Sequence, residues 1–264
     1  MKIVIDGVQL FVSRAGDGSA VVLLHGFPLS HAIWKLQIEA LASASQVIAS
    51  DLRGMGNSDA PPGPYLMENL ASDVAGVLDA FGVARATVIG HSMGGYVALA
   101  FFRMFKERVT GLGLICSRVD ADAPESAQAR LQLADRLEGE GMQPAVDAYL
   151  PRLLAAGASG QLSNVVADLI RAQKPAGAAA MLRGAALRAS SDDLVEDLDV
   201  PVLIVCGAED TISPPDVNRA LAARIQNSEL IVIERSAHLP MLEASGILSG
   251  ALQGFLRRSG INPV

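Results

Sequence analysis

The sequence predicts an α/β protein: a mostly parallel eight-stranded sheet flanked by helices, with a helical cap inserted between two strands. Three observations predict this fold. The chain has 264 residues, half of them apolar, which is long enough to bury a large core in one domain. Strand-like and helix-like segments alternate along most of it. One long segment breaks that alternation and is the expected insertion.

Short apolar runs rich in β-branched residues recur with helix-length segments between them. Parallel strands need such crossover segments, so this alternation predicts a parallel sheet with helices on both faces. The first two runs are separated only by Asp6-Gly7-Val8, which is too short for a crossover, so we expect an antiparallel hairpin at one sheet edge. The expected strands are 2–5, 9–13, 21–24, 47–50, 86–89, 111–116, 202–206 and 230–233.

The rhythm breaks between residues 119 and 198, where the sequence is rich in alanine, leucine and arginine. Its leucines keep a helical spacing and no strand pattern is present. We therefore expect a helical cap over 119–198, inserted into a core made of residues 1–118 and 199–264.

Three prolines are expected to separate the helices of this cap, because proline lacks the amide hydrogen that a helix interior needs. They are Pro144, Pro151 and Pro175.

The alanine-rich stretch 176–180 has an alternative interpretation as a flexible or low-complexity patch. Four apolar cap residues are candidates for a substrate pocket, although their helical spacing is more typical of the core. These four are Leu150, Leu153, Leu154 and Met181.

Charge and composition narrow the expected partners. The formal net charge is −7, and no run of Lys and Arg could neutralise a row of phosphates, so we expect no nucleic-acid binding. Small neutral or weakly polar substrates fit better. No stretch reaches the roughly 18 apolar residues that span a bilayer. Met1-Lys2 leads directly into a strand without a secretion signal, so we expect no membrane partner and a cytoplasmic location.

The strongest functional signal is Gly90-His91-Ser92-Met93-Gly94-Gly95, between an apolar strand and the helical run 96–105. A serine at a sharp strand-to-helix turn is strained, with its hydroxyl projecting, and glycines two residues to either side avoid a clash. The positive end of the following helix lies near any oxyanion that forms. Ser92 is therefore the predicted nucleophile.

A serine hydroxyl needs a base, and the chain has four histidines. His91 adjoins the serine and should point into the packing of the turn. His25 directly follows a strand, where another role is natural, and His31 is expected to be solvated at a helix start. His238 lies after the last strand, at the sheet end where parallel strands bring their carboxyl termini together. His238 is the predicted base.

The base needs a carboxylate to hold its tautomer and stabilise its cation. Asp210 follows the strand 202–206 and gives the chain order Ser, Asp, His that this architecture favours. Glu209 is the main competitor, and Asp120 or Asp122 after the preceding strand is a second one.

Ester cleavage builds negative charge on the carbonyl oxygen, which backbone amides can stabilise. The expected donors are the N–H groups of Met93, next to the nucleophile, and Phe27, in the loop after the strand 21–24. Acyl transfer through these groups requires no metal and no organic cofactor, so we predict neither. A histidine base must be unprotonated to act, so we expect activity to fall below neutral pH.

Together these motifs resemble the α/β-hydrolase superfamily over nearly the whole chain outside the cap. The resemblance implies a triad of Ser92, Asp210 and His238, a structural role for the loop of Asp51 and Arg53, and a lid role for the cap. The supporting stretches are His25-Gly26-Phe27-Pro28, 51–58, 90–95, 207–210 and Ala237-His238.

Within the superfamily the sequence resembles bacterial carboxylesterases and, through residues 209–215, 3-oxoadipate enol-lactonase-like proteins. These lactonases often carry an apolar residue where this chain has His91, which favours a general esterase acting on small esters. Lactone hydrolysis is the alternative, and perhydrolase side activity is compatible with the same triad. From another class, the fold also serves ligand-binding and signalling proteins. Oligomeric state is not predicted.

Overall fold

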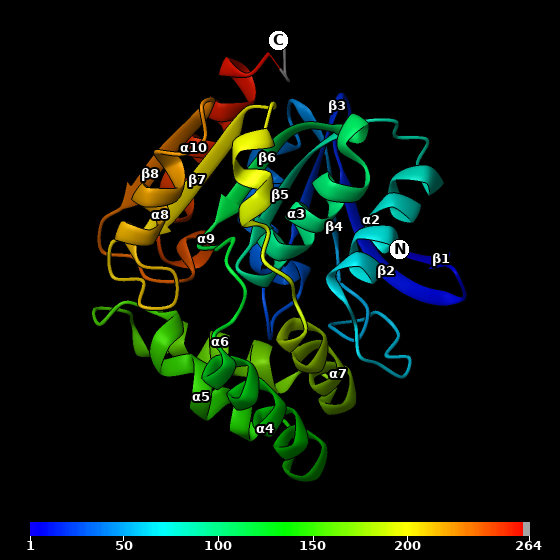
Figure 1. The fold of residues 1–264 in the computed structure, drawn as a ribbon, viewed down its shortest axis with the longest axis vertical. Coiled ribbons are helices and arrows are strands. Elements are labelled where there is room, and N and C mark those ends of the chain that lie inside the picture. The colour runs from blue at the N-terminus through cyan, green and yellow to red at the C-terminus, as the bar shows by residue number, and fades with distance from the viewer. Residues whose placement is uncertain (261–264) are drawn as a thin grey trace.

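The computed structural model describes residues 1–260 and contains one eight-stranded sheet (Figure 1). The strand order is β1-β2-β4-β3-β5-β6-β7-β8. β2 pairs antiparallel with β1 and β4, and all pairs from β4 to β8 are parallel. This confirms the predicted sheet and its N-terminal hairpin. The strands are β1 (Lys2–Ile5), β2 (Val8–Ala15), β3 (Ser19–Leu24), β4 (Ser45–Ser50), β5 (Ala86–His91), β6 (Val109–Ile115), β7 (Val202–Gly207) and β8 (Ser228–Ile233).

Helices cover both faces of this sheet (Figure 1). α2 and α3 contact each other on one face, and α1 and α10 contact each other on the other. Strands β4, β5 and β7 are buried along their whole length, which explains the apolar β-branched residues at their centres. No helix of residues 1–260 is both long and apolar enough to cross a bilayer. The core helices are α1 (Lys35–Leu41), α2 (Met67–Ala80), α3 (Met93–Met104), α8 (Pro215–Ala222), α9 (Pro240–Glu243) and α10 (Ser245–Arg258), with 3-10 turns at His31–Trp34, Lys106–Arg108 and Asp192–Asp197.

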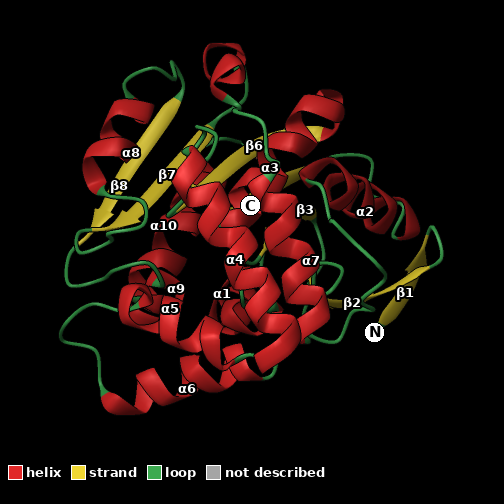
Figure 2. Cartoon of the chain, turned by 60° about the horizontal axis from the view of Figure 1, so that its bottom comes forward, coloured by secondary structure: helices red, strands yellow, loops and turns green. Residues whose placement is uncertain are grey.

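Four helices follow β6 and precede β7, and they gather at one end of the sheet (Figures 1 and 2). Pro144 and Pro175 lie in the first turns of α5 and α7, where a missing amide hydrogen costs nothing. The expectation that Pro151 separates two helices is wrong. It lies inside α5, two residues before the helix ends, where the missing amide costs at most one bond. The helices are α4 (Pro124–Glu140), α5 (Gln143–Leu153), α6 (Gly160–Arg171) and α7 (Pro175–Ala186).

Small residues let α7 pack closely against the core. A Cβ atom on Gly177 would lie 2.1 Å from the carbonyl oxygen of Gly54, and one on Gly184 would lie 1.7 Å from that of Tyr65. Ala178, between them, is fully buried. The alanine-rich stretch is therefore a buried helix that needs small side chains, and the low-complexity alternative does not describe it.

Candidate active site

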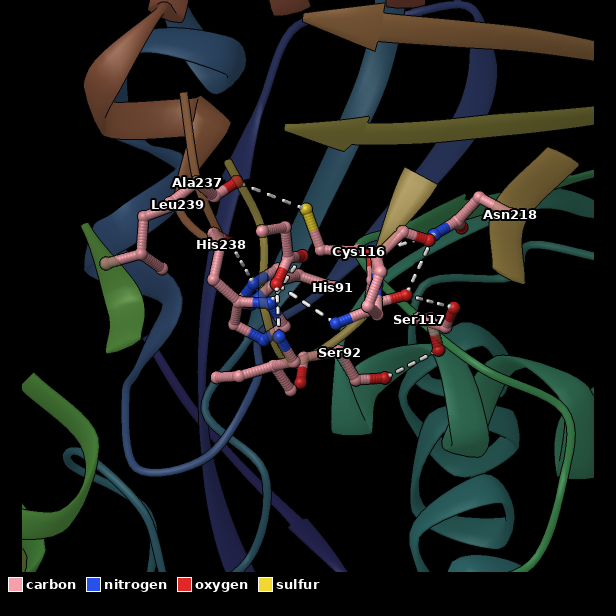
Figure 3. Close-up of polar contacts among 12 residues, drawn as sticks. His91, Ser92, Cys116, Ser117, Asn218, Ala237, His238 and Leu239 are labelled. Atoms are coloured by element: carbon pink, nitrogen blue, oxygen red, sulfur yellow. Dashed lines mark hydrogen bonds and ion pairs between the residues drawn. The ribbon is translucent and has the colours of Figure 1, made fainter. Parts of the chain in front are cut away.

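Ser92 lies at the turn between β5 and α3 in a strained backbone conformation, with φ 51° and ψ −115°. Neighbouring groups hold this conformation from both sides. The Ser92 amide donates to the carbonyl of Ile115 at 2.8 Å. The Ser92 carbonyl accepts from the Gly95 amide at 2.9 Å and from the Ser117 hydroxyl at 2.8 Å (Figure 3). The hydroxyl-bearing Cβ is thus fixed at the top of the turn.

The glycines around Ser92 are required by close backbone packing. A Cβ atom on Gly90 would lie 2.1 Å from the carbonyl oxygen of Gly94, and one on Gly94 would lie 2.4 Å from that of Leu24. No side chain fits at either position. These distances support the steric argument made from the sequence.

His238 and Asp210 form a buried hydrogen-bonded pair. His238 Nδ1 lies 2.8 Å from Asp210 Oδ2, and the amides of Ile212 and Ser213 donate to Asp210 Oδ1 at 2.8 and 3.0 Å. Burial alone would raise the pKa of Asp210, but these hydrogen bonds and the His238 charge outweigh it, so this pKa is lowered. The ionised carboxylate places the ring proton on Nδ1 and leaves Nε2 of His238 free to accept one.

The other carboxylates considered from the sequence have different partners. Glu209 accepts a hydrogen bond from a backbone amide in the segment after α5. Asp120 and Asp122 each bind arginine side chains. Among residues 1–260, Asp210 alone of these four bonds to His238.

His91 supports the backbone that carries His238. Its ring is fully buried, and Nε2 donates to the backbone carbonyl of His238 at 2.8 Å (Figure 3). Burial and, next, the charge of His238 lower the pKa of His91 to about 3, so the ring stays neutral. The sequence indicated that this ring points into the turn, but its bond to a loop 147 residues away has no local signal.

The remaining two histidines are structural. His25 donates from Nδ1 to the Gly26 carbonyl and accepts at Nε2 from the Leu52 amide. His31 opens the 3-10 turn as expected and its side chain is partly exposed, but it is not simply solvated, because its Nδ1 lies 2.7 Å from Asp51 Oδ1. The aspartate fixes the start of the 3-10 turn through the His31 side chain and amide.

Ser92 and His238 line one cavity of about 720 Å³ together with Phe27 and Met93. Within residues 1–260 the Ser92 hydroxyl and the amides of Phe27 and Met93 form no hydrogen bond to the protein. Met93 is the first residue of α3, where amides point outward without a helical partner. Both amides are thus available to a ligand oxygen. None of the four apolar cap residues singled out from the sequence lines this cavity.

A third group lies beside the pair of Asp210 and His238. Cys116 Sγ, a carboxylate oxygen of Asp210 and a ring nitrogen of His238 all lie within 4.8 Å of one another. This spacing could hold a metal ion. Burial, and then the charge of Asp210, raises the pKa of the Cys116 thiol, and the thiol lies 3.8 Å from the Ala237 carbonyl oxygen, to which it donates. Because metal binding needs the thiolate, the raised pKa of Cys116 disfavours a metal ion at this position.

The chain is similar to known proteins in sequence and in fold. Residues 21–248 match the model of the Alpha/beta hydrolase family. A pimeloyl-[acyl-carrier protein] methyl ester esterase of Neisseria meningitidis serogroup A is 30% identical over 244 residues, covering 89% of this chain and 76% of that protein. A thermophilic esterase from Thermogutta terrifontis, solved with malate bound, is 36% identical with a TM-score of 0.95, covering 98% of both chains. The enol-lactonase from Burkholderia xenovorans LB400 is 26% identical with a TM-score of 0.90, covering 97% of this chain and 100% of that one.

Proposed function

Because the chain belongs to the alpha/beta hydrolase family, we propose that it is a serine hydrolase that cleaves carboxylic esters of small molecules. Ser92 is the nucleophile, His238 the base, and Asp210 the residue that orients the base. The 2.8 Å bond between Asp210 and His238, at the wall of the cavity that Ser92 also lines, carries this proposal. The esterases among the relatives support it.

The reaction is a two-step acyl transfer. His238 Nε2 takes the proton of the Ser92 hydroxyl while Oγ attacks the carbonyl carbon of the ester. The tetrahedral intermediate collapses, the C–O bond to the alcohol breaks, and the alcohol leaves with the proton from His238. A water molecule then loses a proton to His238 and attacks the acyl-enzyme, which releases the acid and restores Ser92.

The amides of Phe27 and Met93 are the proposed donors to the oxyanion. Both are free of protein partners in the described chain. The amino end of α3 adds its positive dipole at the same point. Removal of one such donor typically lowers the rate by about 100-fold or more.

We also propose that residues 119–198, which include α4 to α7, form the cap over this cavity, because α4 and α5 supply much of its lining. The predicted independence from metals and organic cofactors, and the predicted cytoplasmic location, stay predictions.

The test compares wild-type protein with Ser92→Ala on p-nitrophenyl esters of increasing acyl length. Ser126→Ala is the matched control, since Ser126 is another serine of the cavity wall. We expect ester turnover in the wild type and the control, and none above background in Ser92→Ala. Equal rates in all three proteins would remove Ser92 as nucleophile, and tight binding without turnover would favour a binding protein.

A lactone is a cyclic ester, so the same residues would open it. The similarity to an enol-lactonase favours this second substrate class. An enol-lactone is therefore assayed beside the open-chain esters. A higher kcat/KM on the lactone would assign the protein to lactone hydrolysis.

A further inference from the structure

The cavity carries positive charge in an acidic protein. The chain has a formal net charge of −7, yet four arginines and only two aspartates line the cavity. The aspartates are Asp120 and Asp122, and the arginines are Arg118, Arg130, Arg136 and Arg152. The net charge of the cavity wall is therefore positive, whereas that of the protein as a whole is negative.

Two of these arginines use only one edge of the guanidinium for their aspartate. Arg118 binds Asp120, and Arg130 binds Asp122, in each case through Nε and Nη2. Within residues 1–260 the Nη1 group of both arginines has no hydrogen-bond partner. Asp122 also binds Arg188, so one carboxylate faces two guanidinium groups and cannot neutralise both.

Arg152 is the most available of the four. Arg152 is an exposed residue in the last turn of α5. Within the described chain its side chain forms no hydrogen bond and no ion pair. By contrast, Arg136 is engaged by Glu140 one turn along α4. A guanidinium that is not used within the protein has all its donors free for a ligand.

Tyr149 connects these arginines to the reacting centre. Its ring packs edge-on against Phe27 at 5.3 Å between centroids, and the Phe27 amide is a proposed oxyanion donor. Burial raises the pKa of the Tyr149 hydroxyl, and the charges of Arg130 and Arg152 oppose that rise, so both arginines act on this hydroxyl. Tyr149 therefore contacts the side chain of Phe27 and is also influenced by the charges of Arg130 and Arg152.

We propose that the substrate is an ester that also bears a free carboxylate, held by Arg152 and the Nη1 group of Arg130 while the ester carbonyl lies at Ser92. This inference rests on the proposed ester hydrolysis and adds the substrate class. Arginine suits the task because its planar fork of N–H groups matches the two oxygens of a carboxylate. The cavity volume of about 720 Å³ leaves room for both ends of such a molecule.

The kinetic test uses two substrates of equal length, mono-p-nitrophenyl adipate and the p-nitrophenyl ester of adipamic acid, which differ only in a carboxylate or a neutral amide. We expect kcat/KM to be about 10-fold higher for the acid, with the ratio shrinking as salt is raised. Arg152→Gln should lower this ratio at least about fivefold. Arg171→Gln, which removes a positive charge from α6 outside the cavity, should leave it unchanged.

A binding measurement separates this inference from the proposed hydrolysis. Calorimetric titration of Ser92→Ala with adipate is expected to show binding that the added change Arg152→Gln weakens by about fivefold or more. Equal rates on the two esters, both dependent on Ser92, would overturn the carboxylate site and leave the esterase standing. Absence of turnover on both would remove the esterase, and absence of adipate binding would remove the site. Tighter binding of inorganic phosphate than of adipate would overturn the assignment to a carboxylate.

Discussion

The Glu243 carboxylate connects the loop of His238 to the chain that follows α5. Its replacement by glutamine measures how much these hydrogen bonds contribute to stability and to kcat. Glu243 Oε1 accepts from the Ala155 amide at 2.6 Å. Its Oε2 accepts from the amides of Ala237 and Leu239, on either side of His238, at 2.9 and 3.3 Å, and from a serine hydroxyl at 3.2 Å. All four partners are donors, so only a group with two acceptor oxygens satisfies them.

Glu243→Gln keeps one of these oxygens and replaces the other with an NH₂ group. If the oxygen stays with the loop of His238, the NH₂ group faces the Ala155 N–H and the charge-assisted bond from that amide is lost. The three hydrogen bonds to the loop then go to a neutral acceptor instead of a charged one. A bond to a charged group contributes about 1.5–3 kcal/mol, so we expect the free energy of unfolding to fall by about 3 kcal/mol. Because the loop carries His238, the proposed base, kcat on a p-nitrophenyl ester should fall by about 10-fold or more.

Urea unfolding and ester kinetics measure the two effects on the same protein samples. Glu209→Gln is the matched control, because exposed Glu209 accepts, among residues 1–260, from a single amide, that of Ala156 in the same segment. The control should lie within about 0.5 kcal/mol of wild type and keep its kcat. If Glu243→Gln behaves like this control, the carboxylate does not position the base and the reasoning is refuted.

Three further changes test other contacts. Asp210→Asn removes the charge that holds the tautomer of His238, so kcat should fall by about 10⁴-fold; a loss below tenfold in the same ester assay would contradict the triad. The unfolded chain protonates His91 below its ordinary pKa of 6.5, whereas the folded ring stays neutral down to about pH 3, so stability falls as the pH falls. His91→Gln should therefore lose about 2 kcal/mol less than wild type between pH 7 and 5 in urea unfolding; equal losses would argue against a neutral buried ring. Gly177→Ala should destabilise the protein by about 1–3 kcal/mol in thermal unfolding, because its Cβ would clash with backbone atoms. The control Gly139→Ala, with open space around it, should be neutral or up to about 1 kcal/mol more stable. Similar melting temperatures for both variants would contradict the close packing of α7.

Features encoded within a few residues were predictable from the sequence. The strands follow from apolar β-branched runs, and the strained turn at Ser92 follows from glycines whose steric need is local. Asp210 was singled out by chain order among several carboxylates, because parallel strands bring their carboxyl ends together whatever lies between them. The structure pairs it with His238 at 2.8 Å.

Features that depend on distant contacts were not predictable. His31 was expected in solvent because its partner Asp51 lies 20 residues away. Nothing near Glu243 indicates that its carboxylate gathers four donors from two segments. The expectation of neutral or weakly polar substrates rests on net charge, which averages over the whole surface and does not report the arginines of the cavity wall; this expectation stays a prediction. Four of the chain's arginines line that wall because α4, α5 and the segment after β6 all contribute to it.

The chain just after α5 connects the proposed carboxylate ligand with the proposed base. The His238 amide donates to the carbonyl of Leu153 at 3.1 Å, and the next contacts along this segment are those of Ala155 with Glu243 and Ala156 with Glu209. Arg152, the proposed carboxylate ligand, is the residue before Leu153. A ligand that holds Arg152 therefore restrains the same backbone that holds the base, so binding energy from a remote carboxylate can orient the reacting groups. Loss of the Arg152 guanidinium should consequently lower kcat on the carboxylate ester as well as raise KM, whereas an effect on KM alone would mean that the two ends of the cavity act independently.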